Sequence, residues 1–212
     1  MKLLLAGASG LIGGHILTQT VARGIEPVLV GRRNLSTGHT EILTTFEEVP
    51  ELPAADAAIC TLGTTIATAG SRSAFYAVDH DAVMSFASAA RDAGVEHFLV
   101  VTAVGANPKA GVYYSRVKGE VERDLETLGF RCLDIAQPGL LIGDRNERRP
   151  VEQFMQFINP VARHFLPGPL SRYAGIEAEA VASALLSLSQ DQDREGVFRY
   201  ENAGLLSAAS QA

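Results

Sequence analysis

The segment Gly7-Ala8-Ser9-Gly10-Leu11-Ile12-Gly13 is the strongest indication of fold class in this chain. It follows a short apolar run, Leu3–Ala6, and precedes an amphipathic pattern that extends to about Arg23. A strand, a glycine turn and a helix in this order form half of a dinucleotide-binding unit. The first glycine permits a sharp turn, the second lets a pyrophosphate approach the backbone, and the third lets the helix pack tightly on the strand.

A glycine triplet also occurs in turns that bind no ligand, so its context matters. Here a strand precedes the triplet and a helix follows it, and the N-terminus of that helix offers free N–H groups and a partial positive charge to phosphates. We therefore expect a nucleotide at this turn. The expected contacts come from Gly7, Ser9, Gly10, Leu11, Ile12 and Gly13.

Bulk composition excludes several classes of protein. The chain has 212 residues and a net charge of −6, which argues against a broad affinity for nucleic acid or an anionic membrane surface. No apolar stretch is long enough to span a bilayer, and the apolar run after Met1 is too short for a signal peptide. Cys60 and Cys132 lie in apolar runs, so we expect buried, reduced thiols in a cytoplasmic protein.

Strands alternate with helices along the chain, which predicts an α/β fold: a Rossmann-type, doubly wound parallel sheet. After the first unit, strands are expected over residues 27–30, 41–44, 56–60, 95–102, 130–136 and 196–200. One helical turn is expected over 46–49, and helices over 71–93, 112–128 and 176–188. Residues 1–212 would form a single domain, in which about 140–180 contribute a small substrate lobe with a salt-bridged loop at 144–149. The tail from Gly204 is expected to fray.

Two further positions suggest ligand chemistry. Arg32 and Arg33 follow the second strand with no acidic residue nearby, and arginine at this place can pair with the 2′-phosphate of NADP. Solvated loop arginines would give the same pattern. Asp79, His80 and Asp81 are consecutive on a helix, so their side chains diverge and cannot meet at one ion. We expect that trio on a solvated face and no metal site.

Tyr114 and Lys118 are four residues apart on an expected helix and therefore share one face. A carbonyl reductase needs a proton donor beside the oxygen that hydride attack makes anionic, and a lysine cation can lower the pKa of a tyrosine for this purpose. Thr102, at the end of the preceding strand, would hydrogen-bond the substrate oxygen. The alternative is a surface tyrosine with a solvated lysine, since this spacing is common by chance.

These motifs together resemble a short-chain dehydrogenase/reductase of the extended or atypical branch. Within that branch the chain is most similar to the Tat-interacting oxidoreductase-like NAD(P)-binding proteins. Besides the glycine turn, the more specific segments are Cys60-Thr61-Leu62-Gly63-Thr64-Thr65 and Lys118-Gly119-Glu120-Val121-Glu122. The resemblance implies a Rossmann fold, bound NADP(H), and a catalytic set of Thr102, Tyr114 and Lys118. It further implies that Leu62, Gly63, Thr64 and Pro138 line the cofactor.

Two functions remain in competition at this point. The first is an NADPH-dependent oxidoreductase that reduces a small carbonyl compound. The second is an NADPH-binding regulatory protein with weak or no catalysis that contacts other proteins, and a homodimer is possible in either case. An epimerase that retains NAD fits poorly with the two arginines after the second strand.

Overall fold

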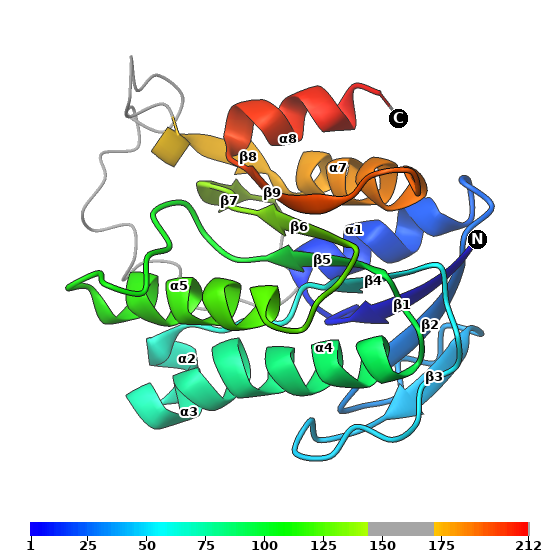
Figure 1. The fold of residues 1–212 in the computed structure, drawn as a ribbon, viewed down its shortest axis with the longest axis horizontal. Coiled ribbons are helices and arrows are strands. Elements are labelled where there is room, and N and C mark those ends of the chain that lie inside the picture. The colour runs from blue at the N-terminus through cyan, green and yellow to red at the C-terminus, as the bar shows by residue number, and fades with distance from the viewer. Residues whose placement is uncertain (144–171, 212) are drawn as a thin grey trace.

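The computed structural model describes residues 1–143 and 172–211. At its centre lies a parallel sheet of seven strands in the order β3-β2-β1-β4-β5-β6-β9 (Figure 1). These strands are β1 (Lys2–Ala6), β2 (Glu26–Gly31), β3 (Thr40–Leu43), β4 (Ala57–Cys60), β5 (His97–Val101), β6 (Cys132–Ala136) and β9 (Gly196–Tyr200). A separate parallel pair is formed by β7 (Leu140–Ile142) and β8 (Gly175–Glu177). The predicted Rossmann-type parallel sheet is therefore confirmed.

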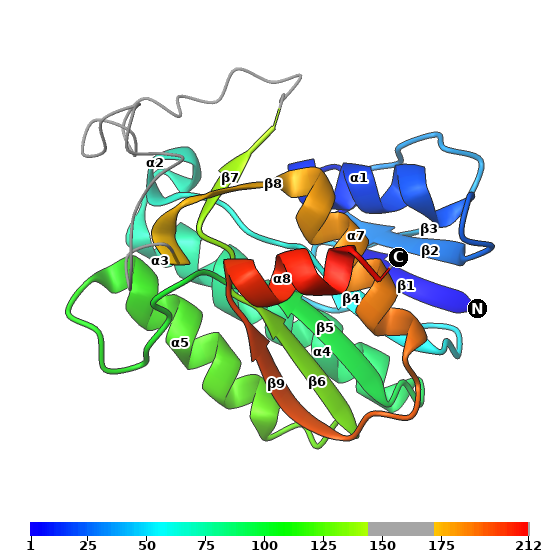
Figure 2. The same cartoon turned by 90° about the horizontal axis from the view of Figure 1, so that it is seen from above.

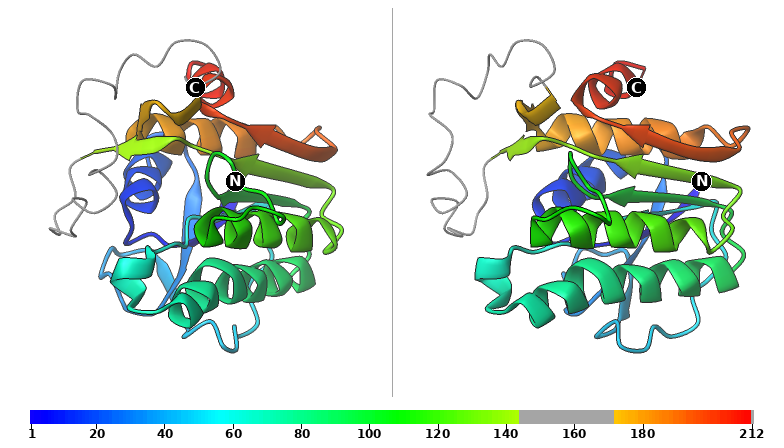
Figure 3. Two further views of the ribbon diagram at one scale, coloured as in Figure 1. Left: turned by 90° about the vertical axis from the view of Figure 1, so that its left-hand side faces the viewer. Right: turned by 60° about the vertical axis from the view of Figure 1, so that its left-hand side comes forward.

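Helices cover both faces of the sheet (Figure 3). One layer contains α1 (Leu11–Thr20), α7 (Ala178–Gln190) and α8 (Asn202–Ala209). The other contains α3 (Arg72–Tyr76), the π-helical turn η1 (Ala77–Asp81), α4 (Ala82–Asp92) and α5 (Tyr113–Glu126), with the short α2 (Ile66–Ala69) beside them. Within residues 1–143 and 172–211, no helix has both the length and the apolar character needed to cross a bilayer.

The two helical layers explain why the strands are apolar almost throughout. In β1, Leu3 and Leu5 pack into the core under α1 and α7, whereas Leu4 and Ala6 pack into the core under α4. Successive residues of a strand point to opposite faces, so a strand covered on both sides needs apolar residues at every position. Cys60 and Cys132 are free and fully buried in these strands, as expected.

Two local expectations are wrong, at 46–49 and in the tail, and the bounds of one predicted helix shift by two residues. Residues 46–49 form no helix, because Phe46 takes a left-handed φ of 70° and buries its ring in the core. The expected helix over 176–188 is preceded by β8, and helix α7 begins only at Ala178. The tail does not fray over its described part, which ends at residue 211. It forms α8, because Leu205 and Ala208 lie three residues apart and are buried in the core that includes α7 residues.

The expected substrate lobe at about 140–180 is described only at its two ends, where β7 pairs with β8. The charged run at 144–149 lies outside the described residues, as does most of the lobe.

Candidate functional site

The predicted ligand-binding residues follow strands that end at one edge of the sheet (Figure 2). The glycine turn follows β1, residues 61–64 follow β4, Thr102 follows β5 and Pro138 comes shortly after β6. From β1 the chain proceeds to β2 and β3 on one side, and then crosses to β4 on the other side. A crevice opens outside the carboxyl ends of the strands at such a reversal, and ligands of open α/β sheets bind there.

The glycine turn is built so that only glycine fits at its two ends. Gly7 has a left-handed φ of 89°, and a Cβ there would lie 2.5 Å from Thr61 Oγ1. A Cβ on Gly13 would lie 2.2 Å from the carbonyl oxygen of Gly7, so α1 packs directly on the turn. Gly10 is the N-cap of α1, makes no side-chain cap, and is followed by a first turn without acidic residues. The first turn of α1 therefore has neither a side-chain cap at Gly10 nor an acidic side chain that would repel a phosphate.

This close packing predicts different outcomes for two neighbouring glycines. Gly13→Ala should destabilise the protein by about 1–3 kcal/mol, because the new methyl overlaps backbone atoms that cannot move independently. Gly14→Ala is the matched control. Its Cβ would meet nothing closer than 3.9 Å, and alanine within a helix is favoured over glycine by roughly 0.5–1 kcal/mol. Urea unfolding of both variants checks this, and equal stabilities would contradict the packing argument.

The second turn, after β4, is tied to the glycine turn. The hydroxyl group of Thr61 donates to the carbonyl oxygens of Ala6 and Gly7 at 3.1 and 3.2 Å. Leu62 and Thr64 are partly buried, and Gly63 is exposed at the rim. The turn that carries residues 62–64 therefore lies directly beside the glycine turn.

A buried ion pair lies directly beneath this second turn. Lys118 Nζ is 2.7 Å from Asp79 Oδ1, and the side chains are 5% and 0% exposed. The backbone N–H of Thr64 donates to Asp79 Oδ2 at 2.8 Å. A Cβ added to Gly63 would lie 3.4 Å from Asp79 Oδ1 and 3.6 Å from Lys118 Nζ. The amine is therefore adjacent to the proposed cofactor surface.

This ion pair corrects the expectation that residues 79–81 lie on a solvated face. The three side chains do diverge, but Asp79 turns inward to Lys118. His80 bridges Asp81 and Asp124, at 2.9 Å in each case. Asp79 was missed because a single acidic residue among polar neighbours gives no sign of burial in the sequence. The one usable signal was its spacing from the buried residues Phe75, Val83 and Phe86, which places it on the inner face of the helix.

Tyr114 and Lys118 share one face of α5, as predicted. Lys118 Nζ lies 6.0 Å from the centroid of the Tyr114 ring, and the ring of Phe75 packs against Tyr114 at a centroid distance of 5.6 Å. Neighbouring Tyr113 points elsewhere, since its hydroxyl donates to the carbonyl oxygen of Arg72 at 3.0 Å. Tyr114 is thus the phenol that shares a site with the lysine.

The pKa of Tyr114 shifts in the opposite direction from the one expected from the sequence. Burial raises the pKa of Tyr114 and the carboxylate of Asp79 raises it further, and together they outweigh the lowering effect of Lys118. Burial by itself would lower the pKa of Lys118, but Asp79, Tyr114 and Cys60 outweigh burial, so the pKa of the amine is raised. The site therefore contains a neutral phenol beside a lysine that stays cationic. The expectation that Lys118 lowers the pKa of Tyr114 below its usual value is wrong.

Thr102 contacts residues of two neighbouring elements. Thr102 is 5% exposed, and its hydroxyl donates to Glu122 Oε1 at 2.6 Å. Gln137 Nε2 donates to both oxygens of Glu122, at 2.9 and 3.0 Å. The hydroxyl of Thr102 also lies 3.4 Å from the carbonyl oxygen of Ala136. In this structure Thr102 helps to join the ends of β5 and β6 to α5, and its contact with a substrate oxygen stays a prediction.

The loop between β5 and α5 is held close to the helix at Gly119. A Cβ at this position would lie 2.2 Å from the carbonyl carbon of Asn107 and 2.3 Å from the nitrogen of Pro108. The glycine in the Lys-Gly-Glu-Val-Glu segment is thus required for the approach of the loop to the helix that carries Tyr114. Pro138 accepts a hydrogen bond from the N–H of Val104 at 3.0 Å, which fixes the segment after β6 to the same loop.

Arg32 and Arg33 are exposed immediately after β2, at the same edge of the sheet as the glycine turn. Their side chains are therefore exposed just beyond the strand next to β1, and a contact with a cofactor stays a prediction.

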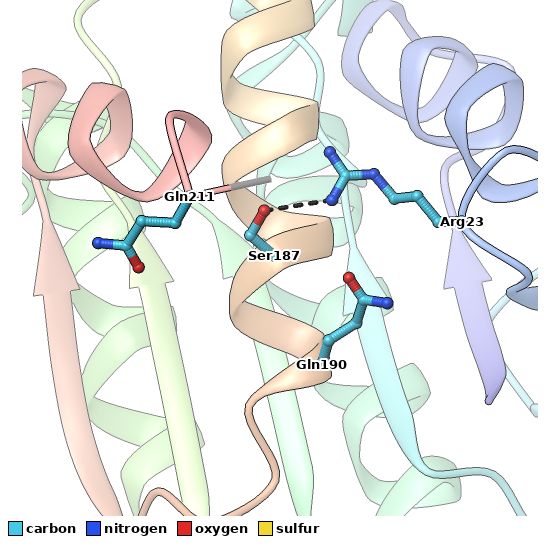
Figure 4. Close-up of a pocket in the computed structure, with 4 residues that line it drawn as sticks. All are labelled: Arg23, Ser187, Gln190 and Gln211. Atoms are coloured by element: carbon cyan, nitrogen blue, oxygen red, sulfur yellow. Dashed lines mark hydrogen bonds between the residues drawn. The ribbon is translucent and has the colours of Figure 1, made fainter.

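Two other features of the described residues lie away from this edge. A hollow of about 480 Å³ is lined by Arg23, Ser187, Gln190 and Gln211, and Arg23 donates to Ser187 Oγ at 3.2 Å (Figure 4). Arg23 follows the C-terminus of α1, whereas the glycine turn precedes its N-terminus. This hollow is therefore separate from the candidate site.

The second feature is a buried cluster of His97, Cys132 and Asp134, whose potential ligand atoms lie within 4.8 Å of one another. Arg194 already donates to both oxygens of Asp134, at 2.9 and 3.0 Å. Burial and the nearby Asp134 raise the pKa of the Cys132 thiol to about 11. The Arg194 guanidinium already neutralises the carboxylate of Asp134, so the cluster is better suited to a structural role than to a metal.

Comparison with known proteins identifies the family. No protein-family model matches the chain. The protein fmp52, mitochondrial, of Emericella nidulans is 36% identical over 168 residues, which cover 72% of each chain. The protein HTATIP2 of Rattus norvegicus is 34% identical over 163 residues, which cover 71% of this chain and 67% of the relative. The chain belongs to this family of atypical short-chain dehydrogenases/reductases.

Solved structures of low sequence identity show the same fold. A putative NAD-dependent epimerase/dehydratase from Bacillus halodurans superposes with a TM-score of 0.71 at 20% identity and covers all of both chains. The human epimerase family protein SDR39U1 with NADPH gives 0.66 at 16% identity, covering 95% of this chain and 74% of that one. MoeE5 in complex with UDP-glucose and NAD gives 0.73 at 17%, covering 100% and 81%.

The same relatives correct one sequence-based expectation. The fmp52 proteins of this family, including one from Aspergillus fumigatus that is 34% identical over 198 residues, are named as mitochondrial proteins. The expectation of a cytoplasmic protein is therefore wrong. It depended on reduced cysteines and on the lack of a recognisable signal peptide, and neither feature distinguishes between compartments inside the cell.

Proposed function

We propose that this protein is an NADPH-dependent oxidoreductase that reduces a small carbonyl compound, with Tyr114 as the proton donor. The observation that carries the proposal is the juxtaposition of three features at one sheet edge. These are the glycine turn, the exposed Gly63 beside it, and the Lys118 ammonium, which would lie 3.6 Å from a Cβ at Gly63. Family membership and the fold of proteins solved with NAD or NADPH support a nicotinamide cofactor.

The residues present fit such a cofactor. A Cβ at Gly13 would overlap the turn, and the uncapped N-terminus of α1 has N–H groups to donate to a pyrophosphate. Leu62, Gly63 and Thr64 would form the opposite wall, and Pro138 the floor at the reactive end. Lys118 would donate to ribose hydroxyls next to Gly63. When bound, the reduced cofactor supplies a hydride to the carbonyl carbon.

The chain's own residues then have distinct tasks. The Tyr114 hydroxyl donates its proton to the oxygen that becomes an alkoxide. Its raised pKa keeps the phenol protonated at neutral pH but makes it a weaker acid, and the Lys118 ammonium opposes that rise. The Lys118 ammonium lies on the same face and stabilises the negative charge that develops on this oxygen and on the phenol. Phe75 packs against the phenol ring and limits its movement, so that the donor stays in position.

The choice of NADPH over NADH depends on the two arginines after β2. A 2′-phosphate would lie near Arg32 and Arg33, and guanidinium groups bind phosphate through paired, charge-assisted hydrogen bonds. We expect the double variant Arg32→Ser, Arg33→Ser to weaken NADPH binding by about tenfold or more, close to 1.4 kcal/mol, and to leave NADH binding unchanged.

Fluorescence titration of both cofactors measures this difference. Arg91→Ser, on the far end of α4, is the control for a general loss of positive charge. If wild type binds the two cofactors equally, or if the double variant loses both to the same extent, the assignment of NADPH is wrong.

A panel of aldehydes and ketones tests the reaction itself. We expect wild type to oxidise NADPH with at least one small carbonyl compound. If it binds NADPH tightly but consumes it with none of them, the oxidoreductase proposal fails and a cofactor-sensing regulatory protein becomes the better account.

A further inference from the structure

The ion pair beneath Gly63 has a feature that the Tyr-Lys motif alone does not require. The Lys118 ammonium is paired with the fully buried carboxylate of Asp79. Asp79 lies on η1, whereas Lys118 lies on α5, so the pair joins two helices of the same layer. The carboxylate is held from its other side by the N–H of Thr64, in the turn proposed to line the cofactor. Three segments therefore converge on this one carboxylate.

Because Lys118 is buried, its protonation depends on the nearby carboxylate of Asp79. An ammonium group removed from water loses hydration free energy and tends to release its proton unless an anion lies close by. Lys118 is 5% exposed, and its charged neighbour at hydrogen-bonding distance is Asp79, at 2.7 Å. The other titratable groups that act on it are Tyr114 on the same helix and Cys60 at the end of β4. Burial raises the pKa of the Cys60 thiol to about 12, so at neutral pH this thiol is uncharged.

We propose, on the basis of the proposed reductase function, that Asp79 is a positioning residue that holds Lys118 charged and in place under Gly63. The same carboxylate offsets the attraction of the Lys118 charge for a phenolate at Tyr114. The pair therefore lowers the pKa of the phenol less than a lone lysine would, and burial, the larger cause, keeps the phenol protonated. In this arrangement the lysine stabilises charge only as it develops during the reaction.

Nuclear magnetic resonance of the lysine Nζ groups tests this directly, because the chain contains only three lysines, Lys2, Lys109 and Lys118. With 15N-labelled lysine, the Lys118 signal is assigned by its loss in Lys118→Arg. We expect it to remain that of an ammonium at pH 10 in wild type. In Asp79→Asn the midpoint of its titration should fall by about one pH unit or more, because burial then acts without a compensating anion.

Two further variants keep the test decisive. Asp79→Glu should restore the ammonium signal at least in part, because it restores the anion. Asp81→Asn, an exposed position two residues along the same helical stretch, should leave the Lys118 signal unchanged. An unchanged Lys118 midpoint in a folded Asp79→Asn protein would overturn the proposal, as would a wild-type Lys118 that is neutral at pH 10.

The pH dependence of carbonyl reduction is a second test. Substitution of a purely structural residue would not shift the pH at which activity falls. In Asp79→Asn the loss of activity at alkaline pH should begin at lower pH than in wild type. Both consequences of the substitution act in this direction, since the pKa of Lys118 falls and the raising effect on the pKa of Tyr114 is removed. An alkaline limb at the wild-type position would contradict the inference.

The titration of Lys118 can be measured whether or not the protein reduces a carbonyl compound. If no carbonyl compound is reduced but Lys118 still depends on Asp79, the reductase proposal fails and the assignment of Asp79 stands.

Discussion

Tyr114→Phe should lower the rate of carbonyl reduction by roughly a hundredfold to ten-thousandfold, the usual contribution of a general acid. The substitution removes one oxygen and keeps the ring, which continues to pack against Phe75. Because the proton is needed only as the carbonyl oxygen becomes negative, we expect the loss in kcat, with the dissociation constant of NADPH little changed.

Tyr113→Phe is the matched control. It removes the same atom from the adjacent residue, whose hydroxyl donates to the backbone of Arg72 rather than facing Lys118. Steady-state kinetics and cofactor titration of the two variants separate a chemical role from a general effect of losing a tyrosine hydroxyl. If Tyr114→Phe is as active as Tyr113→Phe, Tyr114 is not the proton donor.

Asp134→Asn should destabilise the fold by about 3–5 kcal/mol, the usual consequence of removing one partner from a buried ion pair. Asp134 on β6 is 0% exposed and accepts two hydrogen bonds from Arg194, and its Oδ2 lies 2.8 Å from His97 Nε2 on β5. Without the carboxylate the guanidinium group, which is 17% exposed, loses its anion. For a chain of this length, the loss corresponds to a decrease in Tm of roughly 6–20 °C.

Thermal unfolding followed by circular dichroism measures this decrease. Asp193→Asn removes an exposed carboxylate in the loop before β9 and should leave Tm nearly unchanged. Equal Tm values for the two variants would show that the network contributes little to stability. A metal site would behave differently, since Asp134→Asn would then abolish a stabilisation by added zinc that wild type shows.

Much of the fold could be read from the sequence, because its signals are local. The apolar run before Gly7 and the pattern after Gly13 each specify one element, and the alternation of such elements specifies a parallel sheet. The pairing of Tyr114 with Lys118 is equally local, since four residues on a helix make one turn. The weaker predictions concerned segments without periodicity, such as 46–49, where burial of a single aromatic ring decides the backbone conformation.

The strand–turn–helix unit, the parallel architecture and the phenol–amine pair could thus be predicted from residues that lie close together in the chain. The charges of these groups and their contacts depend on packing between distant segments. Asp79 reaches Lys118, and Glu122 reaches Thr102, across elements that are distant in sequence. The physical reason is that the energy of a buried charge depends on every group that surrounds it, and those neighbours are brought together only by packing of the sheet and its helices.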